Sequence, residues 1–219
     1  MYKRQTYEIP NPNLSPEQVV SVELGVSLRT DAVETGAAIY YAQIFDLLAS
    51  VPAKLGGLDT LRRGDTLYRI KWKDNTGHAR IAGLEWAGRY SPYDDVNLTG
   101  NLTITHGQNT TNDEPVGGIP PLFMRIGIEW TPGEAFFETY VRYAAPQHRL
   151  SSDDHDDPRI PRGGTPAWYT LNVRASAQVQ DWLKLQWGIE NMIDRNYREH
   201  GSGINSPGIN VILGFEMKR

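Results

Sequence analysis

The chain has 219 residues, of which 39% are hydrophobic and 22% charged, and its formal net charge is -4 at pH 7. This balance gives no indication of a nucleic-acid partner, and the absence of cysteine excludes a disulfide-stapled domain, a thiol catalyst and a zinc ribbon. No stretch approaches the roughly 18 uninterrupted apolar residues of a membrane helix. Membrane strands escape that test, because every second residue in them is polar.

The first five residues differ from the rest of the chain. Met1 to Gln5 is basic, no apolar segment of a signal peptide comes after it, and it looks like translated sequencing-adaptor sequence. We therefore expect residues 1–5 to be non-native. We expect residues 6–219 to form one domain whose true beginning is missing.

Nine segments with apolar/polar alternation and turn residues at their ends predict nine β-strands, and no helical period competes with them. In the first segment, for example, Val20, Val22 and Leu24 alternate with Ser21 and Glu23. Segments 36–50 and 66–91 keep their phase less well, so we assign no faces there. The predicted strands are 17–29, 36–50, 66–91, 95–109, 121–132, 135–148, 167–180, 182–197 and 208–219.

The connections between these strands alternate in length. Short ones fall at 31–35, 92–94, 133–134 and 181, and long ones at 51–65, 110–120, 149–166 and 198–207. Outer-membrane barrels have this asymmetry, with short periplasmic turns and longer extracellular loops. The sequence therefore predicts an all-β fold, an antiparallel up-and-down transmembrane β-barrel.

One local signal conflicts with this count. The tetrapeptide Asp74-Asn75-Thr76-Gly77 resembles a hairpin turn and would split segment 66–91 into two strands. The segment connects a long-loop rim to a short-turn rim, so it must hold an odd number of strands. We predict one long strand that protrudes past the membrane, with a bulge at Gly77 or Gly83.

Two alternatives remain open. If the turn at residues 74–77 is real, ten strands could close into a complete small outer-membrane barrel that acts as a passive pore or an enzyme. A soluble β-sandwich binding protein would instead pack its apolar faces against each other. Nine strands cannot close as a single-chain bacterial barrel, which has an even number, so the leading prediction is an incomplete barrel.

Three blocks of sequence resemble the C-terminal half of the barrel of TonB-dependent outer-membrane receptors. The third, before and within the last strand, is the most specific. The blocks are Asn11 to Glu17 followed by Glu23-Leu24-Gly25; Ala79-Arg80-Ile81 with Gly83-Leu84-Glu85 and Ile119 to Leu122; and Glu190-Asn191, Asp194 to Tyr197, His200-Gly201-Ser202, Pro207-Gly208, Asn210-Val211 and Leu213-Gly214.

This resemblance implies a 22-stranded barrel with a plugged lumen, of which the chain would hold the last nine strands. It implies a bacterial outer-membrane protein that imports a scarce nutrient, most often a ferric siderophore or haem. Its partners would be membrane lipid, the barrel-assembly machinery, and TonB through a missing N-terminal part with the plug. No enzymatic activity and no cofactor are expected, and no Gly-x-Ser-x-Gly elbow is present.

The last strand departs from the family at two points. Ile209 stands where an arginine is usual, and the chain ends in Met217-Lys218-Arg219 without a terminal aromatic residue. The resemblance implies that this strand is the signal for barrel assembly. Its four residues expected to face lipid are Val211, Leu213, Phe215 and Met217.

Candidate ligand residues cluster in the predicted extracellular loops. His148, Arg149, Arg159 and Arg162 border a run of two serines, four aspartates and His155 at residues 151–157. The guanidinium groups could bind an anionic siderophore or a lipid phosphate, and the carboxylates could hold calcium. The competing interpretation is a solvated loop, and no EF-hand spacing is present, so we predict no metal site.

His200 could contact haem iron or could belong to a loop-packing signature. Two larger sets of residues are assigned to faces and rims. Inward-facing charges form an expected lumenal ladder of Glu23, Glu129, Glu138, Glu190 and Glu216 with Arg29, Arg125, Arg142 and Arg174. Aromatic residues expected in girdles at the two membrane interfaces are Trp130, Phe136, Phe137, Tyr140, Tyr143, Trp168, Tyr169, Trp182, Trp187 and Tyr197.

Overall fold

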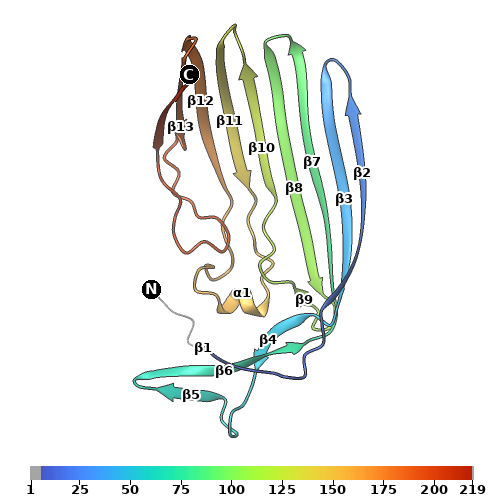
Figure 1. Cartoon of the computed structure of the whole chain (residues 1–219). Coiled ribbons are helices and arrows are strands. Elements are labelled where there is room, and N and C mark those ends of the chain that lie inside the picture. The colour runs from blue at the N-terminus through green and yellow to red at the C-terminus, as the bar shows by residue number, and fades with distance from the viewer. Residues whose placement is uncertain (1–5, 219) are drawn as a thin grey trace.

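The computed structural model describes residues 6–218, so the adaptor-like segment 1–5 lies outside the described residues. Nine long strands form one antiparallel sheet in the order β14-β13-β12-β11-β10-β8-β7-β3-β2, and the short β9 (Glu114–Pro115) pairs with β8 (Figure 1). The long strands are β2 (Gln18–Arg29), β3 (Val33–Phe45), β7 (Ala79–Tyr93), β8 (Val96–Asn109), β10 (Phe123–Trp130), β11 (Ala135–Ala144), β12 (Trp168–Gln180), β13 (Leu183–Glu190) and β14 (Asn210–Met217).

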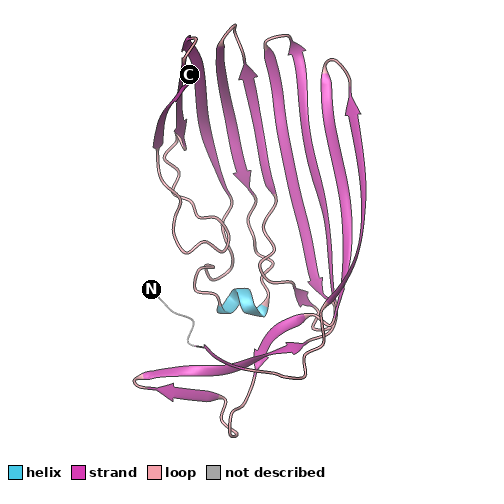
Figure 2. Cartoon of the chain, in the orientation of Figure 1, coloured by secondary structure: helices cyan, strands magenta, loops and turns pink. Residues whose placement is uncertain are grey.

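This sheet is the curved wall of an unclosed barrel, and it confirms the predicted fold class and the count of nine spanning strands. β2 and β14 lie at its two ends and do not pair with each other. A complete ten-stranded barrel is therefore not formed. Figure 2 shows the strands running side by side, with the first and last of them at opposite sides of the wall.

Segment 66–91 is not one strand, and this prediction is wrong. The chain leaves the wall at Asp46, whose φ is 53°, and returns at Ala79 after Gly77, whose φ is 111°. Backbone hydrogen bonds join Leu47 to Gly77 and Thr76 to Leu47 at the two ends of this excursion. The parity argument still holds, because residues 46–78 together form a single long connection.

The predicted bulge is also wrong. Register runs without interruption through Gly83 in both β7 pairings, and the irregularity in the β7–β8 pair lies between Tyr90 and Tyr93. Gly83 instead leaves room for the side chain of Tyr40, which crosses over it. A Cβ there would lie 2.3 Å from the Tyr40 ring, whose hydroxyl group is 2.7 Å from Thr105 Oγ1.

The excursion builds most of a second, four-stranded sheet. In it β6 (Thr66–Asn75) is central, with β1 (Thr6–Ile9) parallel on one side and β4 (Leu48–Pro52) and β5 (Thr60–Arg63) antiparallel to it. Figure 1 places this side sheet beyond the long-loop end of the wall and not against either of its faces. The arrangement is not a β-sandwich.

The predicted alternation of short and long connections is confirmed. Strand pairs β2–β3, β7–β8, β10–β11 and β12–β13 are joined by two to four residues, and all the long connections lie at the other end (Figure 1). The helix α1 (Ser152–Asp156) lies in one of the long loops. Among the described residues, no helix is long and apolar enough to cross a membrane.

Register gives the wall two different faces. Directly opposed residues lie on the same face, and the row Val22, Tyr41, Ala82, His106 and the row Leu24, Ile39, Leu84, Ile104 both belong to the outer one. Apart from Thr139 in the middle of β11 and polar residues near the strand ends, this outer face is apolar from β2 to β14. Val211, Leu213, Phe215 and Met217 lie on it, as predicted from alternation, and Leu213 is 80% exposed.

Aromatic residues mark both ends of the outer face. Trp130 stacks on Phe137 near the short turns, and Tyr143 opposes Tyr169 near the long loops. Three members of the predicted girdles lie on the lumenal face instead: Phe136, Tyr140 and Trp168 lie beneath Arg174, Arg125 and Arg142, respectively. Cation–π contact with lumenal arginines gives these rings a place that alternation within one strand does not reveal.

Candidate functional site

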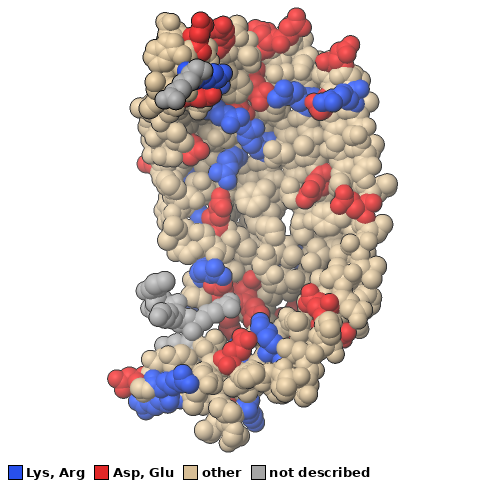
Figure 3. Space-filling model, viewed as in Figure 1, with Lys and Arg blue, Asp and Glu red and all other residues tan. Residues whose placement is uncertain are grey.

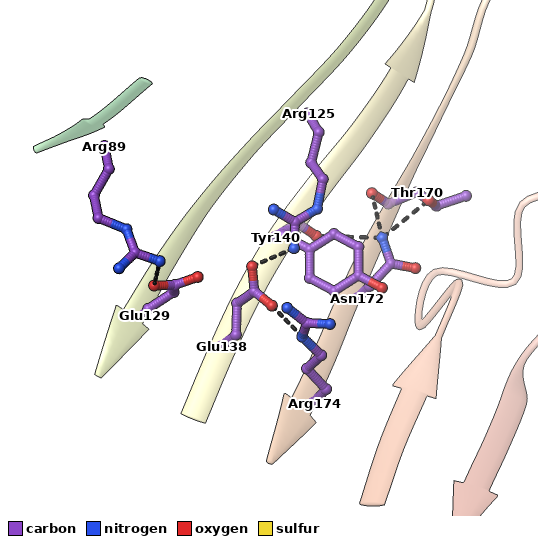
Figure 4. Close-up of polar contacts among 8 residues, drawn as sticks. All are labelled: Arg89, Arg125, Glu129, Glu138, Tyr140, Thr170, Asn172 and Arg174. Carbon is purple, nitrogen blue, oxygen red and sulfur yellow. Dashed lines mark hydrogen bonds and ion pairs between the residues drawn. The ribbon is translucent and has the colours of Figure 1, made fainter. Parts of the chain in front are cut away.

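The lumenal face carries the polar centre of the molecule (Figure 4). Glu138 on β11 is 1% exposed, and its two carboxylate oxygens accept separately from Arg125 on β10 and Arg174 on β12. A buried carboxylate needs such partners, because an unpaired buried charge is strongly destabilising. Three adjacent strands are thereby cross-linked through one side chain.

A second ion pair follows on the same face. Arg89 on β7 donates to Glu129 on β10 over 3.0 Å. Glu129 and Glu138 are directly opposed across β10 and β11, which would be destabilising for two bare carboxylates. Because each has its own guanidinium partner, the like charges are neutralised. In Figure 3 charged side chains gather at both ends of the wall and over β10 to β12.

The predicted lumenal ladder is thus present only in part. Glu138, Arg125 and Arg174 pair among themselves, whereas Glu129 pairs with Arg89, which is not in the predicted set. Arg29 pairs with Glu34 across the first short turn, and Arg142 reaches Glu199 in the last long loop. Alternation indicates the face of each residue, but the partner depends on strand order.

Asn191, from the most specific sequence block, fixes the turn at which the chain leaves β13. Its φ is 52°, a conformation that asparagine tolerates better than most residues, and it is 3% exposed. Its backbone N–H donates to Asn172 Oδ1, and its side-chain amide donates to the carbonyls of Arg195 and Pro207. These bonds fold the last long loop back onto the end of β12.

The acidic segment 151–157 is a capped helical turn. Ser151 is the N-cap of α1 and forms a capping box with Asp154. One oxygen of Asp154 accepts from the Ser151 N–H and the other from the Gly118 N–H, so this carboxylate joins two long loops. Among residues 6–218, no group of three or more His, Asp or Glu side chains has an arrangement that could hold a metal ion.

The candidate ligand residues of this loop take different positions. His148 contacts the Gly163 carbonyl through Nδ1 at 2.7 Å, and His155 is exposed in α1. Arg159 donates to both oxygens of Asp157, and this hydrogen-bonded ion pair raises the pKa of Arg159. Arg162 is exposed at the end of the same loop. Arg149 stands apart, because its guanidinium group lies on the outer wall against His106.

His200 joins the last long loop to the 145–167 loop. Its Nδ1 atom is 2.8 Å from Thr165 Oγ1, and its buried Nε2 has no hydrogen-bond partner in the described region. Burial lowers the pKa of His200, while Asp154 and Asp157 act in the opposite direction. The structure therefore places the predicted residues His148, His155, Arg159, Arg162 and His200 on two adjoining loops at the same rim.

The side sheet adds rim residues that sequence reasoning missed. Arg69, Lys71 and Lys73 lie on one face of β6, and Lys71 Nζ is 3.7 Å from Asp153 and 3.8 Å from Asp156 of α1. A cavity of about 530 Å³ lies between β6 and α1, and Glu8 of β1 also lines it. The turn signal at residues 74–77 marks the end of β6 and could have revealed it as a separate strand. Loop parity led to the prediction of one long strand, although parity is equally satisfied when residues 46–78 form one long connection.

Comparison with known proteins decides the family. A family model described as TonB dependent receptor-like, beta-barrel matches residues 1–192. The chain belongs to this family. No curated protein matches the sequence. The third sequence block begins at Glu190, so its first residues are matched and the rest of it, from Asp194 to Gly214, lies beyond the matched range.

Solved structures show the same fold at low identity. The copper transporter OprC aligns with a TM-score of 0.79 and 19% identity over 94% of this chain and 32% of its own. A mutant ferric enterobactin receptor, PfeA, from Pseudomonas aeruginosa gives 0.76 and 16% over 98% and 34%. The siderophore receptor PirA from Acinetobacter baumannii gives 0.72 and 18% over 94% and 32%. The chain spans about a third of each of these structures.

As a TonB-dependent receptor barrel, the protein is located in the outer membrane of Gram-negative bacteria, and its family consists of transporters rather than enzymes. The apolar outer face then meets lipid and the charged face meets the lumen. The usual asymmetry of outer-membrane barrels predicts that the long loops, the side sheet and the rim residues are on the extracellular side.

Proposed function

We propose that this chain forms part of the barrel of a receptor that imports a ferric siderophore or haem in a TonB-dependent manner. The observation that carries the proposal is the two-faced wall itself: an apolar face of the kind that meets lipid, a paired polar face, and elaborate loops at one rim only. A passive small pore would need a closed sheet, which these nine strands do not form.

The class of ligand is supported by the nature of the rim. His148, Arg159, Arg162 and His200 supply cationic or iron-ligating groups on two adjoining loops. Ferric chelates of this kind are commonly anionic, and haem iron accepts imidazole. Among the aligned structures, PfeA is in complex with enterobactin and PirA is a siderophore receptor, whereas OprC is a copper transporter. The proposal of iron as the cargo therefore rests on the rim residues.

The remaining partners would act through other parts of the protein. The two edges, β2 and β14, would pair with further strands to close the barrel, since unpaired edge groups in lipid cost several kcal/mol each. The plug and the segment that contacts TonB would lie in those other parts. The last strand, β14, with its apolar outer face, would be the signal that the barrel-assembly machinery recognises.

The test is uptake by the complete gene product in a strain that lacks its own siderophore and haem receptors. Under iron limitation we expect growth on one of three sole iron sources, a ferric catecholate, a ferric hydroxamate or haem, and no growth when TonB is absent. Growth that is independent of TonB would contradict the transport mechanism. Copper accumulation without iron-dependent growth would contradict the proposed cargo.

Ligand contact is tested with a matched pair of variants. Arg162→Gln removes an exposed cation from the proposed rim site, and Arg62→Gln removes one from β5, outside the loops that carry it. We expect a several-fold weaker binding of the ferric chelate for the first and unchanged binding for the second. Equal binding by both variants would remove Arg162 from the site.

A further inference from the structure

The outer wall of the barrel carries a basic cluster where an apolar surface is expected. Across β3, β7 and β8, three successive rows of the lipid-facing side are Ile39, Leu84 and Ile104; Tyr41, Ala82 and His106; and Gln43, Arg80 and Gln108. Over two row steps, about 13 Å at the rise of a strand, the surface changes from aliphatic to charged. The change marks the headgroup level on the long-loop side of the membrane.

Arg149 completes this cluster from outside the sheet. The loop after β11 crosses over the end of β8 and lays the guanidinium group on its outer face. Nη1 is 2.9 Å from His106 Nδ1, while Nη2 is 2.8 Å from Gln108 Oε1 and 3.5 Å from the Gly107 carbonyl oxygen. Arg80 is directly opposite Gln108 and also acts electrostatically on the His106 ring.

The base of Arg149 is firmly held. Its backbone N–H donates to Gln147 Oε1, and Gln147 is buried, with its side-chain amide donating to the Ile119 carbonyl. Leu150, the next residue, is buried as well. The anchored backbone and the side-chain contacts with His106 and Gln108 together hold the guanidinium group in one position on the wall, so that little further ordering is needed when another partner binds.

The charges of the cluster are unbalanced. Within residues 6–218, neither Arg80 nor Arg149 forms an ion pair with a carboxylate, and the contacts of Arg149 are with neutral groups. The carboxylate of Asp113 reaches the cluster through Gln108, whose Nε2 donates to it over 3.1 Å. Two guanidinium groups with free donors beside a bilayer are suited to a phosphate, which accepts paired N–H groups.

We propose that Arg80, His106, Gln108 and Arg149 form a binding site for the phosphate-bearing headgroup of a lipid in the surrounding membrane. The lipid is favoured over a soluble anion because the cluster is on the outer wall, directly above the aliphatic row that acyl chains would cover. A transported ligand would instead pass through the lumen. The inference therefore depends on the membrane placement of the barrel and not on its cargo.

The test measures lipid retained by the complete protein. The protein is reconstituted in phosphatidylcholine nanodiscs with a minor fraction of phosphatidic acid, extracted, and analysed by native mass spectrometry. We expect the wild type to retain phosphatidic acid in preference, and the double variant Arg80→Gln with Arg149→Gln to retain roughly tenfold less, since each cation contributes to lipid attraction. The control, Arg62→Gln with Arg63→Gln on β5, removes the same charge and should behave as wild type.

One further measurement and one further variant make the result independent of whether the double variant folds. Heat-dependent gel mobility checks that each variant forms a barrel, and the single variant Arg149→Gln replaces the double variant if that one does not assemble. Equal retention by wild type and an assembled Arg149→Gln or double variant would overturn the proposal. Displacement of the lipid by inorganic phosphate at comparable concentration would also overturn it, because the site would then be one for a free anion.

Discussion

The nine-stranded wall and the four-stranded side sheet follow the same pairing rules, but different interactions fix their registers. In the wall, β2 and β3 pair over twelve residues without interruption, and β10 and β11 over eight. In the side sheet, β1 and β5 each pair with β6 over only four. A one-residue slip in the wall would exchange its apolar and charged faces, so burial and medium define the register there.

The side sheet relies on specific side chains instead. The Asn75 amide donates to the carbonyls of Ser15 and Asp46 and accepts from the Ser15 N–H, Asn11 donates to the Lys73 carbonyl, and Glu17 accepts from the Leu48 N–H. These three residues tie the segment before β2 to the excursion 46–78. Long strands are thus specified by period, and short strands by individual hydrogen bonds.

The largest expected effect is a charge on the outer face of the wall. Leu213→Arg would place a cation against lipid at a cost of ~2 to 4 kcal/mol near the membrane midplane, and we expect the protein to fail to accumulate in the outer membrane. Ile212→Arg is the matched control, because the neighbouring residue lies on the lumenal face of the same strand. Immunodetection in membrane fractions measures both, and equal accumulation would contradict the assignment of faces.

A change on the lumenal face should weaken the wall without preventing assembly. Glu138→Gln leaves Arg125 and Arg174 without their shared carboxylate. Because the side chains of these arginines are 25% and 56% exposed, water compensates in part, and we expect a loss of about 1 to 3 kcal/mol. Urea unfolding in detergent measures the loss. A stability equal to that of wild type would show that the lumenal pairs are dispensable.

The side sheet should be separable from the wall. Asn75→Ala removes three hydrogen bonds and should destabilise the attachment of β6 by about 1 to 2 kcal/mol. Amide hydrogen exchange should accelerate in β4 and β6 and stay unchanged in β10 to β12. Faster exchange throughout the wall would mean that the two sheets form one cooperative unit.

The contact between the two long loops should depend on pH. The pKa of His200 in the folded protein is below its ordinary value of 6.5, so the undocked loop binds protons more readily than the docked one. The contribution of His200 to docking should therefore be fully present above pH 6.5 and should be lost as pH falls through 6.5 and toward the folded pKa. Hydrogen exchange of loop amides near Thr165 measures this, and His200→Gln should remove the dependence on pH.

The smallest effect is expected at the first short turn. Arg29 and Glu34 form an ion pair at 2.6 Å, but their side chains are 78% and 58% exposed. Arg29→Gln should change stability by less than about 1 kcal/mol. A loss as large as that of Glu138→Gln would show that this pair, at the short-turn rim, carries more of the wall's stability than its exposure indicates.

Much of the wall could be predicted from the sequence. Alternation located all nine spanning strands, and loop parity indicated the two rims. The predicted segments 36–50, 66–91, 135–148 and 182–197 extended beyond the wall, which ends at Phe45 in β3, begins at Ala79 in β7, and ends at Ala144 in β11 and at Glu190 in β13. The outer face of β14 was correct at Val211, Leu213, Phe215 and Met217. A strand with media of different polarity on its two faces must alternate with period two. This alternation is a property of neighbouring residues, so it can be recognised in the sequence alone.

The rim and the side sheet could not be predicted in the same way. In β6, Tyr68, Ile70 and Trp72 alternate with Arg69, Lys71 and Lys73, and Ile70 is buried, so a strand is indicated locally. Its partners come from residues 6–9, 48–52 and 60–63, and no local pattern identifies them. Whether the candidate residues at this rim bind a ligand stays a prediction. Their positions depend on contacts such as Asp154 with Gly118 and His200 with Thr165, which join loops far apart in sequence.

The sequence by itself determined the two-faced strands, their number and the long-loop rim, because period and turn chemistry are local properties. Only the tertiary structure decided which charges pair, since Glu138 meets Arg125 and Arg174 through strand order. It also placed Arg149, a loop residue, on the lipid-facing side of β8. Partners across strands and loops are fixed by packing in three dimensions, and no local pattern encodes them.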